Sequence, residues 1–172
     1  MTIDTNDPVN IAQGDPALLE TELAQALLVS TIPARMAYVS IDGTPRIAPT
    51  WFHWTGEEVV MVTFICAPHV TRPARRLRDL RENPDVALSI DTEGFPPVSL
   101  TLRGKVKISV VAGVSPEYAV SAHRYLGEEA GPYLTMLDAP ITEMARIALR
   151  PSWVGLLDFR TRQPEALGGI AS

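Results

Sequence analysis

The sequence predicts a mainly β fold of the α+β class, in which six or seven antiparallel strands close into a barrel with peripheral helices. Three observations lead to this prediction. Several Val- and Ile-rich runs of strand length are separated by short turn signals. The first three runs have hairpin spacing, which makes neighbouring strands antiparallel. The helix-like segments are few and lie between or outside the runs, and at 172 residues the chain is long enough for one buried core.

The N-terminal part divides into a tail and a first helix. Residues 1–14 are polar and acidic without a period, so we expect a flexible acidic N-terminus followed by a single domain over 15–172. Asp15 is placed to cap a helix that has Pro16 in its first turn. Leucines at helical spacing, among them Leu19 and Leu23, form the apolar stripe that would pack this helix on the sheet.

Strand runs and breakers alternate along the rest of the chain. Three strands are expected over 36–41, 46–54 and 58–65, with Gly-containing turns between them. Two longer strands are expected over 85–91 and 98–111, separated by the breaker 94–97. The remaining expected elements are helices over 115–127 and 132–137 and strands over 145–149 and 152–159, which flank a kink at 150–151.

An arginine cluster at the start of a short predicted helix is the most informative functional feature. The helix lies within 71–84, with Pro73 in its first turn and an Asn-Pro stop, so Arg75 and Arg76 fall where the helix dipole is already positive. A bound phosphate would turn this repulsion into attraction. The alternative is a solvated helix face, because Arg75 and Asp79, like Arg78 and Glu82, have the i to i+4 spacing of ion pairs.

Charge and composition argue against several classes of protein. The chain has no apolar run long enough to span a membrane. Five acidic residues among the first 30 account for the whole formal net charge of −5, which is unlike a signal peptide and favours a cytoplasmic location. The rest of the chain is electrically balanced and its arginine-rich helix has no aromatic residue, so we do not expect a nucleic-acid partner.

The single cysteine points to neither a disulfide nor a metal site. Cys66 has no partner for an intrachain disulfide, which fits a reducing compartment. Cys66 and His69 have a CxxH spacing, but no second pair with ligand spacing follows. We therefore expect no metal, and we expect Cys66 to be a small apolar residue at a strand end.

Several short motifs, in order and at characteristic spacing, resemble the pyridoxamine 5'-phosphate oxidase-like FMN-binding split-barrel superfamily, including its F420-dependent branch. They are DGTP at 42–45, PTWF at 49–52, the Arg75–Arg76 pair with the Asn-Pro turn at 83–84, LRGK at 102–105, ARI at 145–147 and DF at 158–159. The resemblance covers about 32–159. It implies a split β-barrel, a homodimer with the cofactor between subunits, and FMN as cofactor, with F420 as the alternative.

The resemblance also assigns candidate cofactor-binding residues. In the family a basic pair before the Asn-Pro turn grips the phosphate, and Arg75 and Arg76 hold those positions. The strand carrying Thr50, Trp51 and Phe52 would line the ring, largely through its backbone, although core packing would equally explain the two aromatic residues. The further candidates are Thr63 at a strand end, Arg72 in the preceding loop and Arg103, for which a solvated strand face or a subunit contact is the alternative.

The chemistry implied is hydride transfer to or from a small organic substrate. A flavin or deazaflavin carries this chemistry in its own ring system, so no catalytic side chain is predicted. The chain departs from a true pyridoxamine phosphate oxidase, because no His follows His123 and the Arg-x-His substrate pair is missing. Two alternatives stay open at this point: a non-catalytic flavin-binding or storage protein, and a barrel that has lost its cofactor and serves as an interaction module.

Overall fold

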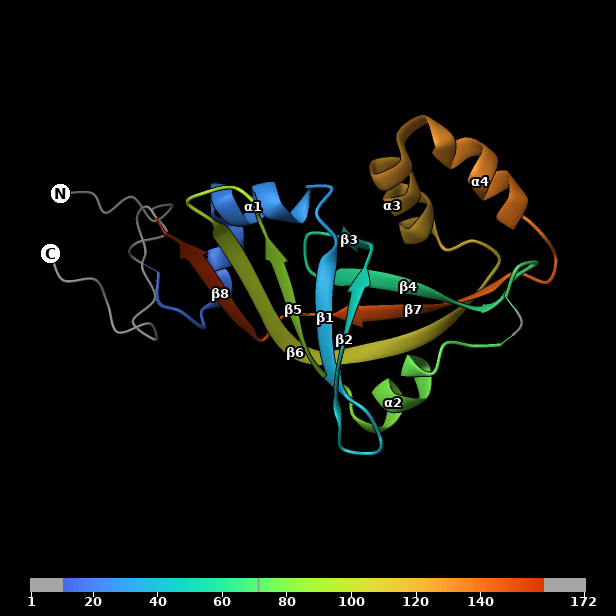
Figure 1. The fold of residues 1–172 in the computed structure, drawn as a ribbon, viewed down its shortest axis with the longest axis horizontal. Helices are drawn as coiled ribbons and strands as arrows, with labels where there is room; N and C mark the ends of the chain where they lie inside the picture. Colours follow the sequence, from blue (N-terminus) through green and yellow to red (C-terminus); the bar gives the residue numbers. More distant parts are fainter. Residues whose placement is uncertain (1–10, 71, 160–172) are drawn as a thin grey trace, which may run out of the picture.

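The chain folds as one curled antiparallel sheet with helices on its outer side and at its open edge (Figure 1). The computed structural model describes residues 11–70 and 72–159. The flexible N-terminus was expected over residues 1–14, and residues 1–10 lie outside the described part of the chain. Residues 13 and 14 are tied to the last strand, since Gly14 N donates to Val154 O at 2.7 Å and the Gln13 amide donates to Leu156 O.

Eight strands occupy the described residues, and seven of them form a path in the order β2-β1-β5-β6-β7-β4-β3, with β8 paired to β6. Their bounds are β1 Ala34–Val39, β2 Pro45–Thr50, β3 Phe52–Trp54, β4 Val59–Cys66, β5 Asp85–Asp91, β6 Val98–Ala112, β7 Glu143–Leu149 and β8 Trp153–Asp158. The mainly β, antiparallel prediction is confirmed. The eighth strand arises because the run expected over 46–54 breaks at Trp51 into β2 and β3.

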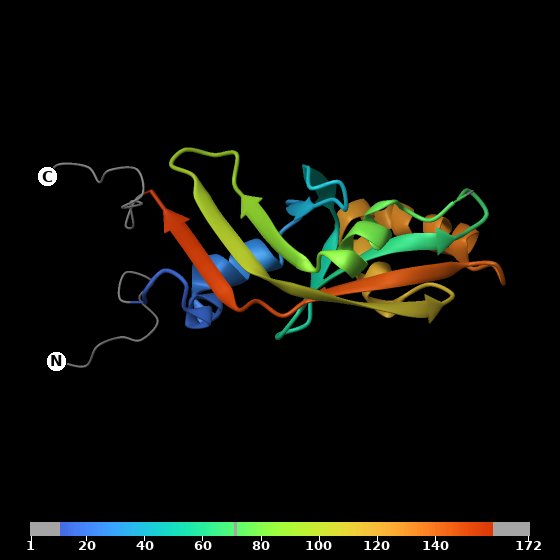
Figure 2. The same cartoon turned by 90° about the horizontal axis from the view of Figure 1, so that it is seen from below.

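The barrel is split rather than closed, which corrects the closed form expected from the strand pattern alone. β2 and β3 lie at the two ends of the strand order and do not pair with each other. β6 makes the curl possible: its first half pairs with β5 and β8, and its second half with β7. β7 and β8 follow each other along one edge of β6, and the kink at Pro151 separates them (Figure 2).

The first helix is shorter than the one that the leucine stripe predicted. A 3-10 turn over Pro16–Glu20 is capped by the Asp15 side chain, and α1 over Glu22–Leu28 begins only after Thr21, whose hydroxyl accepts from Ala24 N. Leu18 and Leu28 are both fully buried, so the two pieces still pack on the sheet as one apolar unit.

Two further helices, α3 over Pro116–Leu126 and α4 over Ala130–Leu137, form a hairpin that covers the β3–β4 side of the sheet (Figure 1). A short 3-10 turn over Gly127–Glu129 joins them. We call this hairpin the helical cap. Both helices were predicted, α3 almost to the residue, because Pro116 follows an N-terminal Ser and Gly127 ends the helix with a positive φ of 58°.

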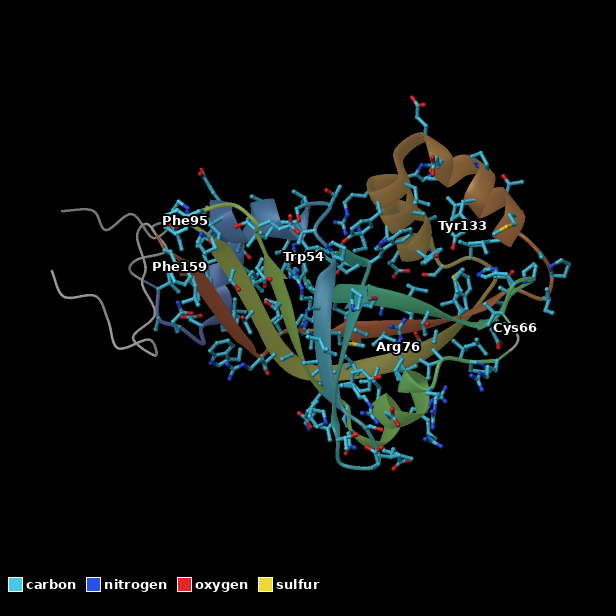
Figure 3. All side chains as sticks on the ribbon, viewed as in Figure 1. Trp54, Cys66, Arg76, Phe95, Tyr133 and Phe159 are labelled. Carbon is cyan, nitrogen blue, oxygen red and sulfur yellow. The ribbon has the colours of Figure 1, made fainter. Side chains whose placement is uncertain are left out.

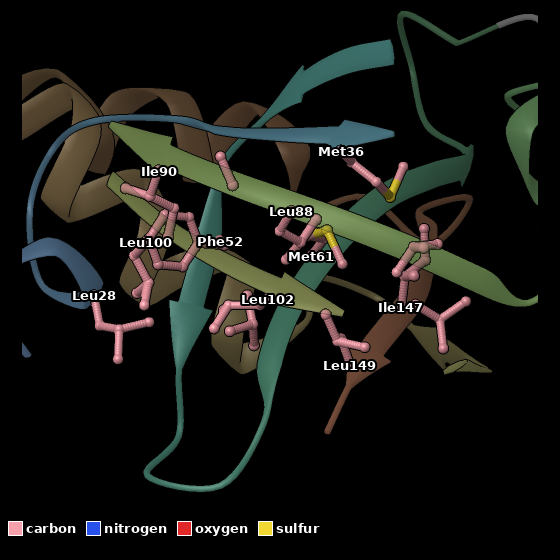
Figure 4. Packing of buried hydrophobic residues seen from close by; sticks show 14 of the residues in the cluster. Leu28, Met36, Phe52, Met61, Leu88, Ile90, Leu100, Leu102, Ile147 and Leu149 are labelled. Atoms are coloured by element: carbon pink, nitrogen blue, oxygen red, sulfur yellow. The ribbon is translucent and has the colours of Figure 1, made fainter. Parts of the chain in front are cut away.

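The buried apolar residues form two clusters. The larger one fills the barrel and includes Phe52, Met61, Leu88, Leu102 and other labelled side chains of Figure 4. The smaller one lies between the sheet and the helical cap. Residues of β4 alternate between the two, as strand geometry requires: Met61 faces the barrel, whereas Val62 and Phe64 face the cap. No helix among the described residues is long and apolar enough to cross a membrane.

Candidate functional site

The short helix α2, Arg76–Glu82, packs beside β1 and carries the arginine cluster. Leu77 and Leu80 bury its apolar side in the main core. Asp79 is 5% exposed, and its carboxylate accepts a long hydrogen bond of 3.5 Å from the backbone N of Ile41. The Asn83 amide donates to Val39 O at 3.4 Å. These contacts fix α2 against the β1–β2 hairpin.

Arg76 lies on the side of α2 that faces the sheet (Figure 3). Its side chain is half-buried, and its Nε atom is buried without a hydrogen-bond partner among the described residues. Burial lowers the pKa of the guanidinium from its ordinary value, with a smaller opposing effect from Tyr38 on β1. A cationic donor that is desolvated and lacks an acceptor is costly. The position therefore fits an anionic ligand that supplies the missing acceptor.

The other arginines of the cluster are exposed and poorly paired. Arg75 is the residue before the first turn of α2, and neither of the two ion pairs expected from helical spacing forms. Arg78 instead approaches Asp79 at 4.0 Å, the outer limit for an ion pair. Arg72, Arg75, Arg78 and Arg81 are all exposed. The helix face that carries these arginines is therefore solvated, but it lacks the two ion pairs that sequence spacing suggested.

The segment Thr50–Trp51–Phe52 connects the two edges of the split barrel. Thr50 ends β2 and is 7% exposed, while Phe52 begins β3 and is fully buried in the main core. Trp51 points the other way, into the helical cap, where it stacks on Tyr125 with ring centroids 5.1 Å apart and planes 5° apart. Both aromatic side chains thus take part in packing.

Thr63 and Arg103 occupy different places. Thr63 on β4 is 8% exposed and lies on the barrel side of its strand, in the same alternation as Met61. Arg103 on β6 is exposed on the outer sheet face, where its guanidinium lies 3.8 Å from the centroid of the Trp153 ring. Arg103 also lines a groove of about 460 Å³ on that face, together with Ala37, Tyr38, Val39, Pro45, Arg46, Asp85, Val86, Ala87, Gly104 and Ser152.

Sequence reasoning missed the residues by which the helical cap is attached. Arg146 on β7 donates to Glu117 on α3 and to Glu58 before β4, at 2.7 and 2.9 Å. Burial opposes ionisation of Glu117, but hydrogen bonds from Ser115 and Arg146 bring its pKa below the ordinary value. Tyr118 and Tyr125 share one helix face because they are seven residues apart, and that spacing was the available signal. Burial and the hydroxyl of Tyr133 raise the pKa of Tyr118.

A metal centre is not supported in the part of the chain that the structure describes. Within 11–70 and 72–159, no group of three or more His, Cys, Asp or Glu side chains is arranged to hold an ion. Cys66 ends β4 half-buried, and His69 packs its ring edge-on against Phe64 with 5.0 Å between centroids. The CxxH pair is thus part of a strand end and its loop.

No protein-family model and no curated protein matches this chain. Solved structures do match. One described as an F420 reductase is 27% identical, with 76% of this chain and 94% of the other covered and a TM-score of 0.60. A conserved hypothetical protein from Mycobacterium tuberculosis is 18% identical, with 88% and 90% covered and a TM-score of 0.60. A putative pyridoxamine 5'-phosphate oxidase from Listeria innocua is 15% identical, with 77% and 94% covered and a TM-score of 0.51.

The chain has the split-barrel fold of the pyridoxamine 5'-phosphate oxidase-like superfamily. The expectation from the sequence motifs is confirmed at this level. In this split barrel β2 and β3 are the two ends of the strand order, and α2 packs beside β1. Within the fold, the candidate residues fall into one group around Arg76 on α2 and another at the 50–52 strand break.

Proposed function

We propose that this split barrel is an oxidoreductase that binds a phosphate-bearing flavin or deazaflavin and transfers hydride to or from a small organic substrate. The observation that carries the proposal is Arg76, a half-buried cation whose Nε has no partner among the described residues. A phosphate oxygen would accept from Arg76 and offset the cost of burying it. The bound ring system would supply the hydride chemistry.

The residues of this chain bind and orient the cofactor in the proposal. Arg76 and the neighbouring Arg75 hold the phosphate, with Thr63 as a hydroxyl donor on β4 and Arg72 in the preceding loop. The backbone of Thr50, Trp51 and Phe52 lines the ring. Arg103 lies on the outer sheet face, so we assign it to the edge of the site formed with a second subunit.

F420 is the cofactor that the exposed arginines favour, with FMN as the alternative. FMN carries a single terminal phosphate, which Arg75 and Arg76 suffice to hold. F420 carries a phosphodiester and an acidic glutamyl tail, and Arg78 and Arg81 lie two and five residues after Arg76 on α2 without close carboxylate partners. The 27% identity to a structure described as an F420 reductase supports the same choice.

A homodimer follows from the same proposal, and the outer face of β1, β2 and β5 is the surface for it. Ala37 on β1 lies opposite Ile47 on β2 and Ala87 on β5, and residues directly opposite share a face. Ile47 is 69% exposed and Val39 is 45% exposed. Apolar side chains gathered on one sheet face are typical of an interface. The groove lined by Arg103 opens on this face.

The decisive experiment is a titration of the purified protein with FMN and with F420, followed by fluorescence polarisation of the cofactor. We expect Arg76→Ala to weaken binding about 10- to 100-fold, the range for one charge-assisted hydrogen bond of about 1.5–3 kcal/mol. Arg150→Ala is the matched control, because Arg150 is exposed and paired with Glu57 on another part of the surface. Binding of neither cofactor by the unaltered protein would overturn the proposal.

The same titration separates the two cofactors. If F420 binds through its acidic tail, Arg78→Ala and Arg81→Ala weaken it further, whereas FMN affinity does not respond to either change. Consumption of the reduced cofactor in the presence of candidate acceptors then distinguishes an oxidoreductase from a protein that only stores the cofactor.

A further inference from the structure

Arg124 in the last turn of α3 joins three segments that are far apart in the sequence. Its Nη1 donates to Leu28 O, at the end of α1, over 3.0 Å. Its Nη2 donates to Phe52 O, at the start of β3, and to the Tyr125 hydroxyl at 3.2 Å. The guanidinium therefore ties the helical cap both to the first helix and to the strand that follows the break at Trp51.

Ring contacts strengthen the same junction. The guanidinium of Arg124 lies 4.6 Å from the centroid of Phe52 and 4.8 Å from that of Tyr125. Tyr125 stacks on Trp51 and donates its hydroxyl to Ile32 O at 3.3 Å. Trp51 at the strand break and Phe52 directly after it are thus both held from α3, Trp51 through its ring and Phe52 through its ring and carbonyl.

Arg124 contacts the backbone between β2 and β3, where the sheet holds the chain least firmly. β2 and β3 are the two ends of the strand order, so the backbone between them is not flanked by strands on both sides. A planar guanidinium can hold two carbonyl groups and stack on rings at once, which a lysine ammonium cannot do. Small errors in the placement of a binding group weaken a ligand out of proportion to the change.

We propose that Arg124 is a positioning residue that fixes the backbone of Thr50–Phe52 where the cofactor ring binds. The inference rests on the proposed function, because the ring subsite is part of it. Arg124 acts through Phe52 and Tyr125 and touches no reacting atom. It is also separate from the phosphate subsite, which belongs to Arg76 on α2, so the two parts of the site can be disturbed independently.

The test compares Arg124→Lys with the unaltered protein, using whichever of FMN and F420 the latter binds. We expect the affinity to fall about ten-fold or more and the visible absorption and circular dichroism of the bound cofactor to move toward those of the free one. Inorganic phosphate, which probes the Arg76 subsite alone, should compete with the cofactor at an unchanged inhibition constant. His123→Gln, an exposed neighbour in the same turn, serves as the control and should change neither measurement.

A second variant keeps the test decisive if Arg124→Lys does not fold. Tyr125→Phe removes the hydroxyl that joins Arg124 to Ile32 but keeps the ring stacked on Trp51, and it should shift the cofactor spectrum in the same direction by a smaller amount. A folded Arg124→Lys with unchanged affinity and spectrum would overturn the positioning role while leaving the proposed function intact. Failure of the unaltered protein to bind either cofactor would overturn both.

Discussion

The Nε of Arg146 on β7 donates to Oε1 of Glu117 on α3 over 2.7 Å, and the same guanidinium reaches Glu58 at 2.9 Å. The three side chains are only 20 to 29% exposed. They therefore lie between the sheet and the helical cap, largely out of solvent. One cation bridging two carboxylates from separate elements holds the cap in place.

Loss of this cation should cost more than loss of a surface cation. Arg146→Met leaves Glu58 and Glu117 half-buried without their partner, so we expect the free energy of unfolding to fall by about 1–3 kcal/mol. Arg150→Met breaks a pair with Glu57 that is 65% and 73% exposed, and such pairs contribute about 0–1 kcal/mol. Urea unfolding of the two variants measures both. An equal fall in the free energy of unfolding in both variants would show that the ion pairs of Arg146 contribute no more than a surface ion pair.

The β architecture could be predicted from the sequence because its signals are local. Val- and Ile-rich runs and the turns at Gly43 and Gly56 mark the strands, and both glycines adopt a positive φ, at 78° and 95°. The ring part of the proposed site was harder to predict, because it lies at a strand break. Nothing near Trp51 in the sequence announces that break, which is held by Arg124 and Tyr125 from a helix that follows much later in the chain.

The arginine cluster shows the same limit. Its position at the start of α2 was visible in the sequence, and spacing alone allowed ion pairs from Arg75 to Asp79 and from Arg78 to Glu82. Asp79 is instead turned inward to the backbone of Ile41 and is buried. Helical periodicity does not say which side chain the tertiary fold removes from the surface, and the inward turn of Asp79 leaves Arg75 without the expected ion pair.

His53 on β3 should make stability depend on pH. Burial is the main reason that its pKa lies below the usual value, the positive charge of Arg124 adds to the effect, and Glu117 opposes it. The unfolded chain therefore binds a proton at a higher pH than the folded one. The contribution of neutral His53 to the free energy of unfolding is complete above the ordinary histidine pKa of about 6.5. This contribution is lost as the pH falls through the lower folded-state pKa.

Urea unfolding at pH 7.5 and at pH 5.5 measures this loss. His53→Gln should lose less stability over that interval than the unaltered protein, because glutamine does not titrate. His69→Gln and His123→Gln make the same substitution at two exposed histidines and serve as controls. A His53→Gln variant with the full pH dependence would assign the effect to other groups.

A charge on the outer sheet face should separate the proposed dimer. Ile47 on β2 is 69% exposed among apolar neighbours, and Ile47→Glu would place an unpaired carboxylate in the centre of the interface. We expect light scattering after gel filtration to show a monomer for this variant and a dimer for the unaltered protein. Cofactor affinity should fall with it, because the site edge at Arg103 is then open to solvent.

The control for this experiment is Val29→Glu. Val29 is 64% exposed but lies at the end of α1 and on no strand of the proposed interface, so the same charge there should leave the dimer intact. If both variants remain dimeric, the subunits meet through another surface and Arg103 no longer belongs to the interface. If the unaltered protein is a monomer at concentrations where it binds cofactor, one chain suffices for the site, and the groove beside Arg103 is a solvent-exposed part of it.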